Sequence, residues 1–343
     1  MKKFFTTIKN IFSIEDLRVR IMNTIGFLII FRLGSYIVLP GVDANLLAGN
    51  QGGIFDLLNT FLGGSFSRAS IFALGIMPYI SASIVVQLLT VAVPHFTKMQ
   101  KEGDSGRKKL NQFTRVLTIA ITAAQSYGYL RTTINDEALT NPGMFWMVSS
   151  IIILISGTMF CMWLGERITD KGIGNGISML IMIGIVSRFP AAIWQEMDAK
   201  GMNGALLFII ELLALFFVVV GVIALTQATR RIPVQYAKQV VGNKLYGGKR
   251  DFIPLKLNSA GVMPIIFAQA LMFIPPLLAG IWRDSDLGAY VGSTFADFTS
   301  WQYNLLFAIL ILLFTFFYTA ITVPSNDIAD NLKRNGGFVP GIK

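Results

Sequence analysis

The sequence predicts an all-α, polytopic membrane protein, and three observations support this fold class. The 343-residue chain is 53% hydrophobic and 14% charged, against about 25% charged residues in an ordinary soluble domain. Eight apolar stretches are long enough, or nearly so, for a bilayer that takes about 20 residues to cross. Lys and Arg gather between alternate stretches. The eight expected spans are residues 21–40, 71–93, 116–130, 143–165, 173–195, 204–226, 260–282 and 303–323.

Positive charge gives the expected orientation of these spans. When Lys and Arg are assigned to alternating sides, 23 of the 29 lie on one side and 5 on the other, with Arg188 near the outer end of the fifth span counted among the 5, while Arg32 lies within the first span. Cytoplasmic loops carry such an excess of Lys and Arg, so both termini are expected to be cytoplasmic. We therefore interpret the net charge of +10 as a signal for orientation and for anionic lipid, rather than for nucleic acid.

Two further segments are apolar without spanning. Phe4, Phe5 and Ile8 recur at helical spacing and predict an amphipathic helix over residues 1–20 on the inner leaflet, with a disordered basic tail as the alternative. Residues 53–66, GIFDLLNTFLGGSF, are too short to cross. Backbone that enters lipid without spanning must be helical or enclosed by protein. This predicts a re-entrant helix ended by two glycines, and the alternative is a surface helix on the outer leaflet.

The second span is polar and interrupted. Pro78 removes one helical hydrogen bond, two serines and Gln87 add polar groups, and Ile76 and Ile80 lie four residues apart on one face. Similar interruptions begin the fifth span, GIGNGIS, and the seventh, NSAGVMP. Interrupted helices in several spans favour a pathway through the protein. Ordinary packing is the alternative, since small and polar residues also join membrane helices.

Two basic segments on the expected cytoplasmic side are large. The first is KMQKEGDSGRKKLNQFTR, from Lys98, and the second covers residues 227–256. In the second, basic and apolar residues nearly alternate, which predicts a projecting hairpin with Gly247 and Gly248 in its turn. Such a hairpin suits a large acidic partner, either ribosomal RNA or an acidic protein face. The alternative is additional positive-inside charge without a hairpin.

Few residues are of types and spacings that indicate catalysis or metal binding. Cys161 is the single cysteine, which excludes an intrachain disulfide and a multi-cysteine metal site. No GxxxxGK[ST] phosphate loop occurs. Glu211, the only acidic residue in a span, is either a proton or ion site or a packing partner near the end of its helix. The only histidine, His95, lies at the cytoplasmic end of the second span, away from any nucleophile within the bilayer. We expect neither enzymatic activity, including intramembrane proteolysis, nor a cofactor.

A secondary transporter is the alternative function. Transporters also have interrupted helices, but they normally place ionisable or substrate-binding groups at mid-membrane. Here aliphatic residues follow the interruptions.

The chain contains four distinctive motifs: RASIFALGIMPYISASI from Arg68, KEGDSGRKKLNQFTR from Lys101, MWLGERITDKGIGNGIS from Met162 and DNLKRNGGFVPGIK from Asp330. These motifs resemble those of the SecY family of bacterial protein-translocation channels. The resemblance extends along the whole chain and implies a plasma-membrane channel that translocates unfolded polypeptides and releases transmembrane segments laterally into lipid. It implies two pseudo-symmetric halves of five helices that close like a clamshell around an hourglass pore, here residues 21–200 and 201–343.

The resemblance also implies site residues, carried over by motif. A pore waist maps onto Ile76, Ile80, Ile181 and Ile266. A lateral gate between the second and third helices and the seventh and eighth has Gln87 and Asn258 as polar candidates. A plug of about residues 54–67 includes Ile54, Phe55, Leu57, Leu58, Phe61, Gly63 and Gly64. The docking surface for ribosome or motor comprises Arg107, Lys108, Lys109, Arg230, Arg231, Lys238, Lys244, Lys249, Arg250 and Lys343.

The implied partners are SecE-like and SecG-like small membrane subunits, a SecA-type motor ATPase, the ribosome, signal sequences, nascent polypeptides and anionic lipids. The sequence departs from the family pattern in two places. Family members have ten spans, whereas eight are expected here, so we expect a truncated or partial copy. Lys343 stands where the family usually has arginine, which keeps the charge but loses the planar fork of the guanidinium.

Overall fold

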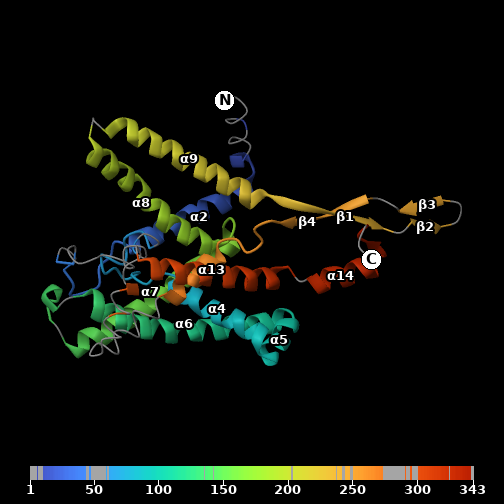
Figure 1. Ribbon diagram of the computed structural model, residues 1–343. Coiled ribbons are helices and arrows are strands. Elements are labelled where there is room, and N and C mark those ends of the chain that lie inside the picture. Colours follow the sequence, from blue (N-terminus) through green and yellow to red (C-terminus); the bar gives the residue numbers. More distant parts are fainter. Residues whose placement is uncertain are drawn as a thin grey trace. The chain divides into compact units, whose positions relative to one another are not determined.

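Helices dominate the computed structural model of the chain (Figure 1). The chain folds as two compact units, Met1–Trp194 with Ile274–Ser300, and Gln195–Phe273 with Trp301–Lys343. The structure describes residues 6, 11–43, 46–47, 59, 62–134, 136–141, 143–201, 204–236, 238–241, 244–247, 250–272, 290, 294–295, 300–323 and 325–340.

The first unit is built from long helices. Helix α6 packs against both α4 and α7, and α2 packs on α7. Arg115 of α6 donates two hydrogen bonds of 2.8 Å to the carboxylate of Glu166 on α7, which joins these helices at one end. The helices are α2 (Glu15–Gly34), α4 (Met77–Ala92), α5 (Pro94–Lys101), α6 (Asp104–Thr133), the 3-10 helix η1 (Asp136–Ala138), α7 (Met144–Lys171) and α8 (Gly176–Lys200), whose last turns belong to the second unit.

The second unit combines apolar helices with a β-ribbon. Strands β1 and β4 pair antiparallel, β5 pairs with the other edge of β1, and β2 pairs with β3. Helix α10 packs on α13. The elements are α9 (Ala205–Gln227), β1 (Thr229–Tyr236), β2 (Lys238–Val241), β3 (Lys244–Gly247), β4 (Arg250–Lys256), α10 (Met263–Met272), α13 (Trp301–Thr322), α14 (Ser325–Arg334) and β5 (Gly337–Phe338).

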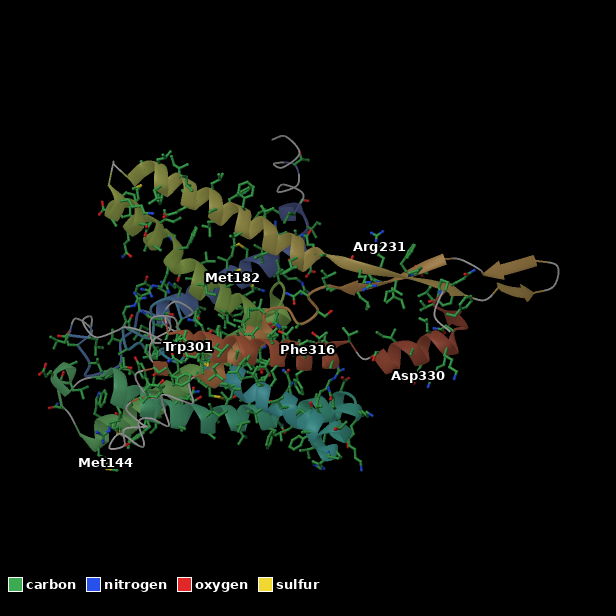
Figure 2. The ribbon with its side chains drawn as sticks, in the orientation of Figure 1. Met144, Met182, Arg231, Trp301, Phe316 and Asp330 are labelled. Carbon is green, nitrogen blue, oxygen red and sulfur yellow. The ribbon has the colours of Figure 1, made fainter. Side chains whose placement is uncertain are left out.

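Four described helices are long and apolar enough to cross a membrane, namely α7, α8, α9 and the Trp301–Ala320 part of α13. Helices α4 and α5, bent by 99° at Val93, give a fifth if they count as one span. Helix α9 has no buried residue, and Trp301 and Phe316 of α13 are exposed in Figure 2, as side chains that face lipid or a partner would be. The described helices agree with a multi-pass protein, and the total of eight spans stays a prediction.

Two segments differ from the sequence-based expectation. Helix α6 begins at Asp104, so much of the first basic segment is helical rather than a loop. Hydropathy detects only the apolar part of a helix, and the polar first turns of α6 escape it. Helix α2 ends at Gly34, before the expected end of the first span, and Val38 then forms a β-bridge with Ser70.

Aromatic stacking and two glycine contacts pack α2 and α7 closely against the segment around Phe72. The Phe72 ring stacks between Phe31, with centroids 5.9 Å apart, and Phe160, at 5.8 Å. A Cβ atom at Gly34 would lie 2.0 Å from the Phe72 ring, and one at Gly157 would lie 2.1 Å from the carbonyl oxygen of Ile71. These two glycines therefore let α2 and α7 close on the segment that leads into α4.

Candidate functional site

The entry of α4 carries two of the expected waist residues. Gly75 has φ +52°, and Ile76 is the N-cap residue of α4, with Pro78 in the first turn where its missing N–H costs nothing. The amide of Ile80 donates to the carbonyl of Ile76 at 3.1 Å. The two side chains are 4% and 5% exposed. The structure thus places them one turn apart, on one face, away from water.

Helices α7 and α8 cross closely beside this entry. A Cβ atom at Gly176 would lie 1.9 Å from the carbonyl oxygen of Gly165, so backbone meets backbone there. A Cβ atom at Gly165 would lie 3.2 Å from Ile177 and 3.6 Å from Ile76. The glycine of α7 therefore brings an isoleucine of α4 and one of α8 to the same point.

The start of α8 is fixed by a side chain of its own turn, Asn175, and by one from α7, Thr169. The side-chain oxygen of Asn175 accepts from the amides of Ile177 and Ser178, at 3.0 and 3.2 Å, and the Thr169 hydroxyl accepts from the Gly176 amide at 2.9 Å. These bonds satisfy amides that have no partner within the helix. The GIGNGIS interruption is therefore an ordered helix start.

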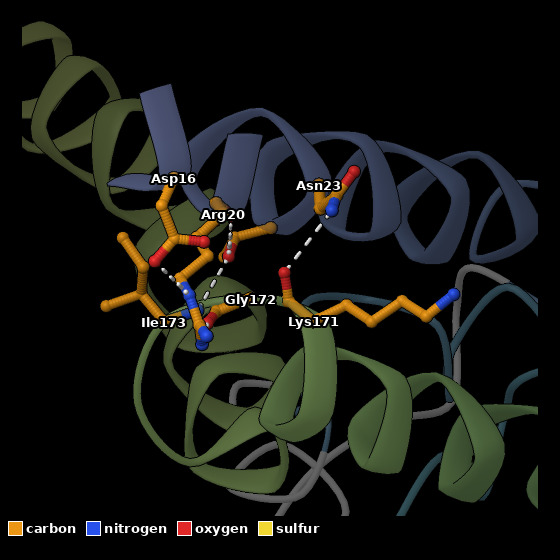
Figure 3. Close-up of polar contacts among 7 residues, drawn as sticks. Asp16, Arg20, Asn23, Lys171, Gly172 and Ile173 are labelled. Atoms are coloured by element: carbon orange, nitrogen blue, oxygen red, sulfur yellow. Dashed lines mark hydrogen bonds and ion pairs between the residues drawn. The ribbon is translucent and has the colours of Figure 1, made fainter. Parts of the chain in front are cut away.

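Side chains of α2 form hydrogen bonds to residues 171–173, which connect α7 to α8 (Figure 3). Asn23 donates to the carbonyl of Lys171 at 3.3 Å, and Arg20 donates to the carbonyl of Gly172 at 3.5 Å. The Thr24 hydroxyl accepts from the amide of Ile173 at 3.0 Å. A positively charged side chain near the last carbonyls of α7 is favourable. Thus α2, α7 and α8 are bonded to one another near the expected waist.

The other two waist candidates are placed less completely. Ile181 lies one turn after Ile177 on α8 and is half-buried. Ile266 lies on α10 in the second unit. The structure thus brings Ile76 and the first turn of α8 together beside Gly165, and the meeting of all four waist candidates stays a prediction.

The expected plug lies mostly outside the described residues. Ile54, Phe55, Leu57, Leu58 and Phe61 belong to the undescribed part, whereas Asn59 and residues 62–68 are described. Gly63 and Gly64 have φ angles of +64° and +89°, a left-handed conformation that suits glycine. The amide of Gly64 donates to the Asn59 carbonyl at 2.8 Å.

The two polar gate candidates bond within their own segments. Gln87 donates to the Ser83 hydroxyl at 3.2 Å, one turn back on α4. The side-chain oxygen of Asn258 accepts from the amide of Gly261 at 2.9 Å, in the turn that precedes α10. Asn258 therefore shapes the interrupted start of its helix, and a gate contact for either residue stays a prediction.

The second basic segment forms a β-ribbon. Thr229 pairs with Lys256 at the base, and Gln235 pairs with Arg250. Arg230 and Arg231 are exposed on β1, and the Arg231 side chain projects from the ribbon in Figure 2. Farther out, Lys238 pairs with Gly247.

The ribbon differs from the expected hairpin in its turn, and it gains a third strand. Gly247 lies in β3 rather than in the turn, since Val241 pairs with Lys244 and the chain reverses between them. Phe338 of β5 pairs with Gln235. The segment after α13 thus joins the same sheet as the ribbon, which the sequence did not predict.

The remaining basic candidates are distributed between helix and ribbon. Arg107, Lys108 and Lys109 lie in the first turns of α6, where Lys109 lies 3.9 Å from Glu102. Lys244 lies in β3 and Arg250 in β4. Lys249 and Lys343 lie outside the described residues.

The acidic residue of the expected sixth span, Glu211, has a basic partner. Lys200, at the end of α8, forms ion pairs with Glu211 of α9 and with Glu196. This pairing favours the packing interpretation of Glu211 over an ion site. His95 is exposed at the start of α5. Within the described residues no group of three or more His, Cys, Asp or Glu side chains is arranged to hold a metal ion.

The sequence analysis missed Arg68 and assigned no role to Arg32. Both side chains converge on Gly63, with the Arg32 Nη1 atom 2.9 Å and the Arg68 Nη2 atom 3.1 Å from its carbonyl oxygen. A signal was available: Arg32 is a charge within an apolar stretch, and such charges normally have a buried partner or a function.

Comparisons with known proteins agree with this architecture. The sequence model of the SecY family matches residues 70–343. The protein translocase subunit SecY of Halalkalibacterium halodurans is 43% identical over 352 residues, which cover 99% of this chain and 81% of that protein. The corresponding subunit of Streptomyces coelicolor is 40% identical and covers 98% of this chain and 82% of its own length.

A solved structure titled a protein conducting channel has the same fold. Its TM-score is 0.61 at 17% identity, and the match covers 95% of this chain and 78% of that one. The family match and the two relatives carry the assignment, and the chain belongs to the SecY family of protein translocase subunits, multi-pass membrane proteins that form the protein-conducting channel.

Proposed function

We propose that the translocation pore is sealed at a waist to which Ile76, Ile80, Ile181 and Ile266 contribute. The observation that carries this proposal is the burial of Ile76 and Ile80, one turn apart at the interrupted entry of α4, where Ile76 lies beside Gly165 of α7. A constriction of flexible aliphatic side chains stays dry while idle and deforms around a polypeptide when one is threaded through it. No covalent step is needed, so the energy comes from an external motor or from the ribosome.

The other elements follow from the same proposal. The segment of residues 54–67 is the plug on the outer side of the waist. The lateral gate lies beside α4 and α6 in the first unit and α10 and α13 in the second, with Gln87 and Asn258 as its polar contacts. Signal sequences and transmembrane segments leave the pore through this gate, and both termini of the chain are cytoplasmic.

The ribbon and the basic start of α6 form the docking surface. Its exposed arginines suit the phosphates of ribosomal RNA or the acidic surface of a SecA-type motor. Anionic lipid attracts the same basic segments near the membrane, and SecE-like and SecG-like subunits cover apolar faces such as that of α9. A secondary transporter is the second candidate, but the interrupted helices α4 and α10 begin with aliphatic residues.

A photoreactive amino acid at Gln87 tests the gate. In membranes that contain a stalled secretory chain, we expect it to crosslink the signal sequence. The control position is Leu213 on α9, an exposed apolar residue that has no role in the gate. Equal crosslinking at both positions, or none at Gln87, would remove Gln87 from the gate.

A further inference from the structure

The turn at residues 62–68, here called the Gly63 turn, is held by two arginines that come from different parts of the first unit. Arg32, on the last turn of α2, donates to the carbonyl oxygen of Gly63 at 2.9 Å. Arg68 donates to the same oxygen at 3.1 Å and through Nε to the carbonyl oxygen of Gly64 at 3.1 Å. One backbone oxygen thus accepts from two guanidinium groups.

Tyr36 keeps the two guanidinium groups together. The Arg68 guanidinium carbon lies 4.2 Å from the centroid of the Tyr36 ring, and that of Arg32 lies 4.9 Å away. Arg32 also donates to the Tyr36 hydroxyl at 3.2 Å. The negative face of an aromatic ring attracts cations, so the ring offsets part of the repulsion between the arginines.

Within the described part of the chain, no carboxylate neutralises these positive charges. Among the residues that the structure describes, no Asp or Glu side chain lies within 4.0 Å of either guanidinium group. Two like charges held close together repel each other. Their close approach depends on the Gly63 carbonyl oxygen that they share, so both arginines lose a hydrogen bond when Gly63 moves away.

The geometry leaves little space at the Gly63 turn. A Cβ atom at Gly63 would lie 2.8 Å from each of Arg32 Nη1, the Gly184 carbonyl oxygen and the Ser187 hydroxyl. A Cβ atom at Gly64 would lie 2.7 Å from Arg68 Nη2. Glycine is needed at both positions for the arginines to reach the backbone.

We propose that Arg32, Arg68 and Tyr36 form a releasable clamp that positions the C-terminal end of the plug segment through the carbonyl oxygen of Gly63. The three side chains are positioning residues: they hold the turn while the channel is idle, and their mutual repulsion favours release once one bond breaks. The contribution of the clamp to sealing rests on the proposed function of the plug segment. The clamp's hold on the Gly63 turn does not depend on that proposal.

Thiol labelling tests the clamp directly. Ser65 is 1% exposed, so a cysteine placed there in a Cys161→Ala background reports whether the turn opens. In the intact channel complex, Arg32→Gln and Arg68→Gln should each accelerate labelling by a water-soluble maleimide about tenfold, because each removes charge-assisted hydrogen bonds that oppose local opening. Gly64→Ala should do the same with both arginines present.

Arg131→Gln is the matched control. Arg131 is exposed and stacks on Tyr127, with its guanidinium carbon 6.0 Å from the ring centroid, so the variant loses the same charge and the same type of contact elsewhere. Its labelling should equal that of the parent. The native Cys161, buried in α7, reports global unfolding when the same variants are made without the Ser65 substitution.

Faster labelling at position 65 with Cys161 still protected supports the clamp. Parental labelling in both arginine variants, or labelling that rises equally at Cys161, overturns it. Idle ion conductance separates the clamp from the plug: faster labelling with unchanged conductance keeps the clamp and contradicts the sealing role of the plug segment.

Discussion

Ribosome binding is expected to fall about 10- to 100-fold when Arg230, Arg231 and Lys238 are all changed to Glu, because charge complementarity governs such encounters. The two arginines are exposed on β1, and Lys238 lies farther along the ribbon on β2. Most of the 23 Lys and Arg residues on the expected cytoplasmic side remain, so the orientation of the flanking helices should not change.

Co-sedimentation with ribosomes at increasing salt measures this effect. Wild-type binding should weaken as salt rises, since exposed charges are screened over about 8 Å at physiological ionic strength. The matched control, Arg230→Lys with Arg231→Lys, keeps the charge and should bind nearly as the wild type does if charge dominates. A charge-reversed protein with wild-type affinity would contradict the docking role of the ribbon.

Ion conductance of the idle channel complex should rise strongly when Ile76 and Ile80 are both changed to Ser. The two side chains are 4% and 5% exposed, and hydroxyl groups in their place would let water enter a dry constriction. Asp at position 80 should have a larger effect, since an acidic side chain at mid-membrane costs roughly 2.5 to 3.5 kcal/mol on insertion scales unless it is hydrated.

Ion conductance is measured in planar bilayers, and the stability of each variant is measured in parallel. Truncating a buried aliphatic side chain costs about 2 to 5 kcal/mol, so the thermal unfolding of each variant is recorded as well. Val85→Ser is the control, because Val85 lies on α4 but is 40% exposed. If the folded Ile76→Ser, Ile80→Ser protein conducts no better than this control, neither isoleucine belongs to the waist.

Hydropathy predicts the apolar helices because it reflects the membrane that they cross. The expected span 143–165 corresponds to α7, and 204–226 corresponds to α9 within a residue at each end. The near alternation in the second basic segment likewise matches the paired strands β1 and β4. In each case the pattern records which side chains meet lipid, protein or water.

Contacts between distant segments could not be predicted in this way. The crossing of Gly165 and Gly176 depends on how α7 and α8 approach each other, and single glycines do not reveal their partners. The convergence of Arg32 and Arg68 on Gly63 joins residues 31 and 5 positions away from it in the chain. The pairing of β5 with β1 joins segments about a hundred residues apart. Hydrophobic periodicity carries no information about such long-range contacts.

Site-specific photocrosslinking at Ile80 tests most directly whether α4 lines the translocation pore. A photoreactive amino acid there should crosslink the polypeptide when a secretory chain is stalled in the channel, whereas the same group at Val85 should crosslink it far less. In the idle channel neither position should give a product with secretory protein. Equal yields at the two positions, or no product at Ile80 with the stalled chain present, would show that translocating polypeptides do not pass this face of α4.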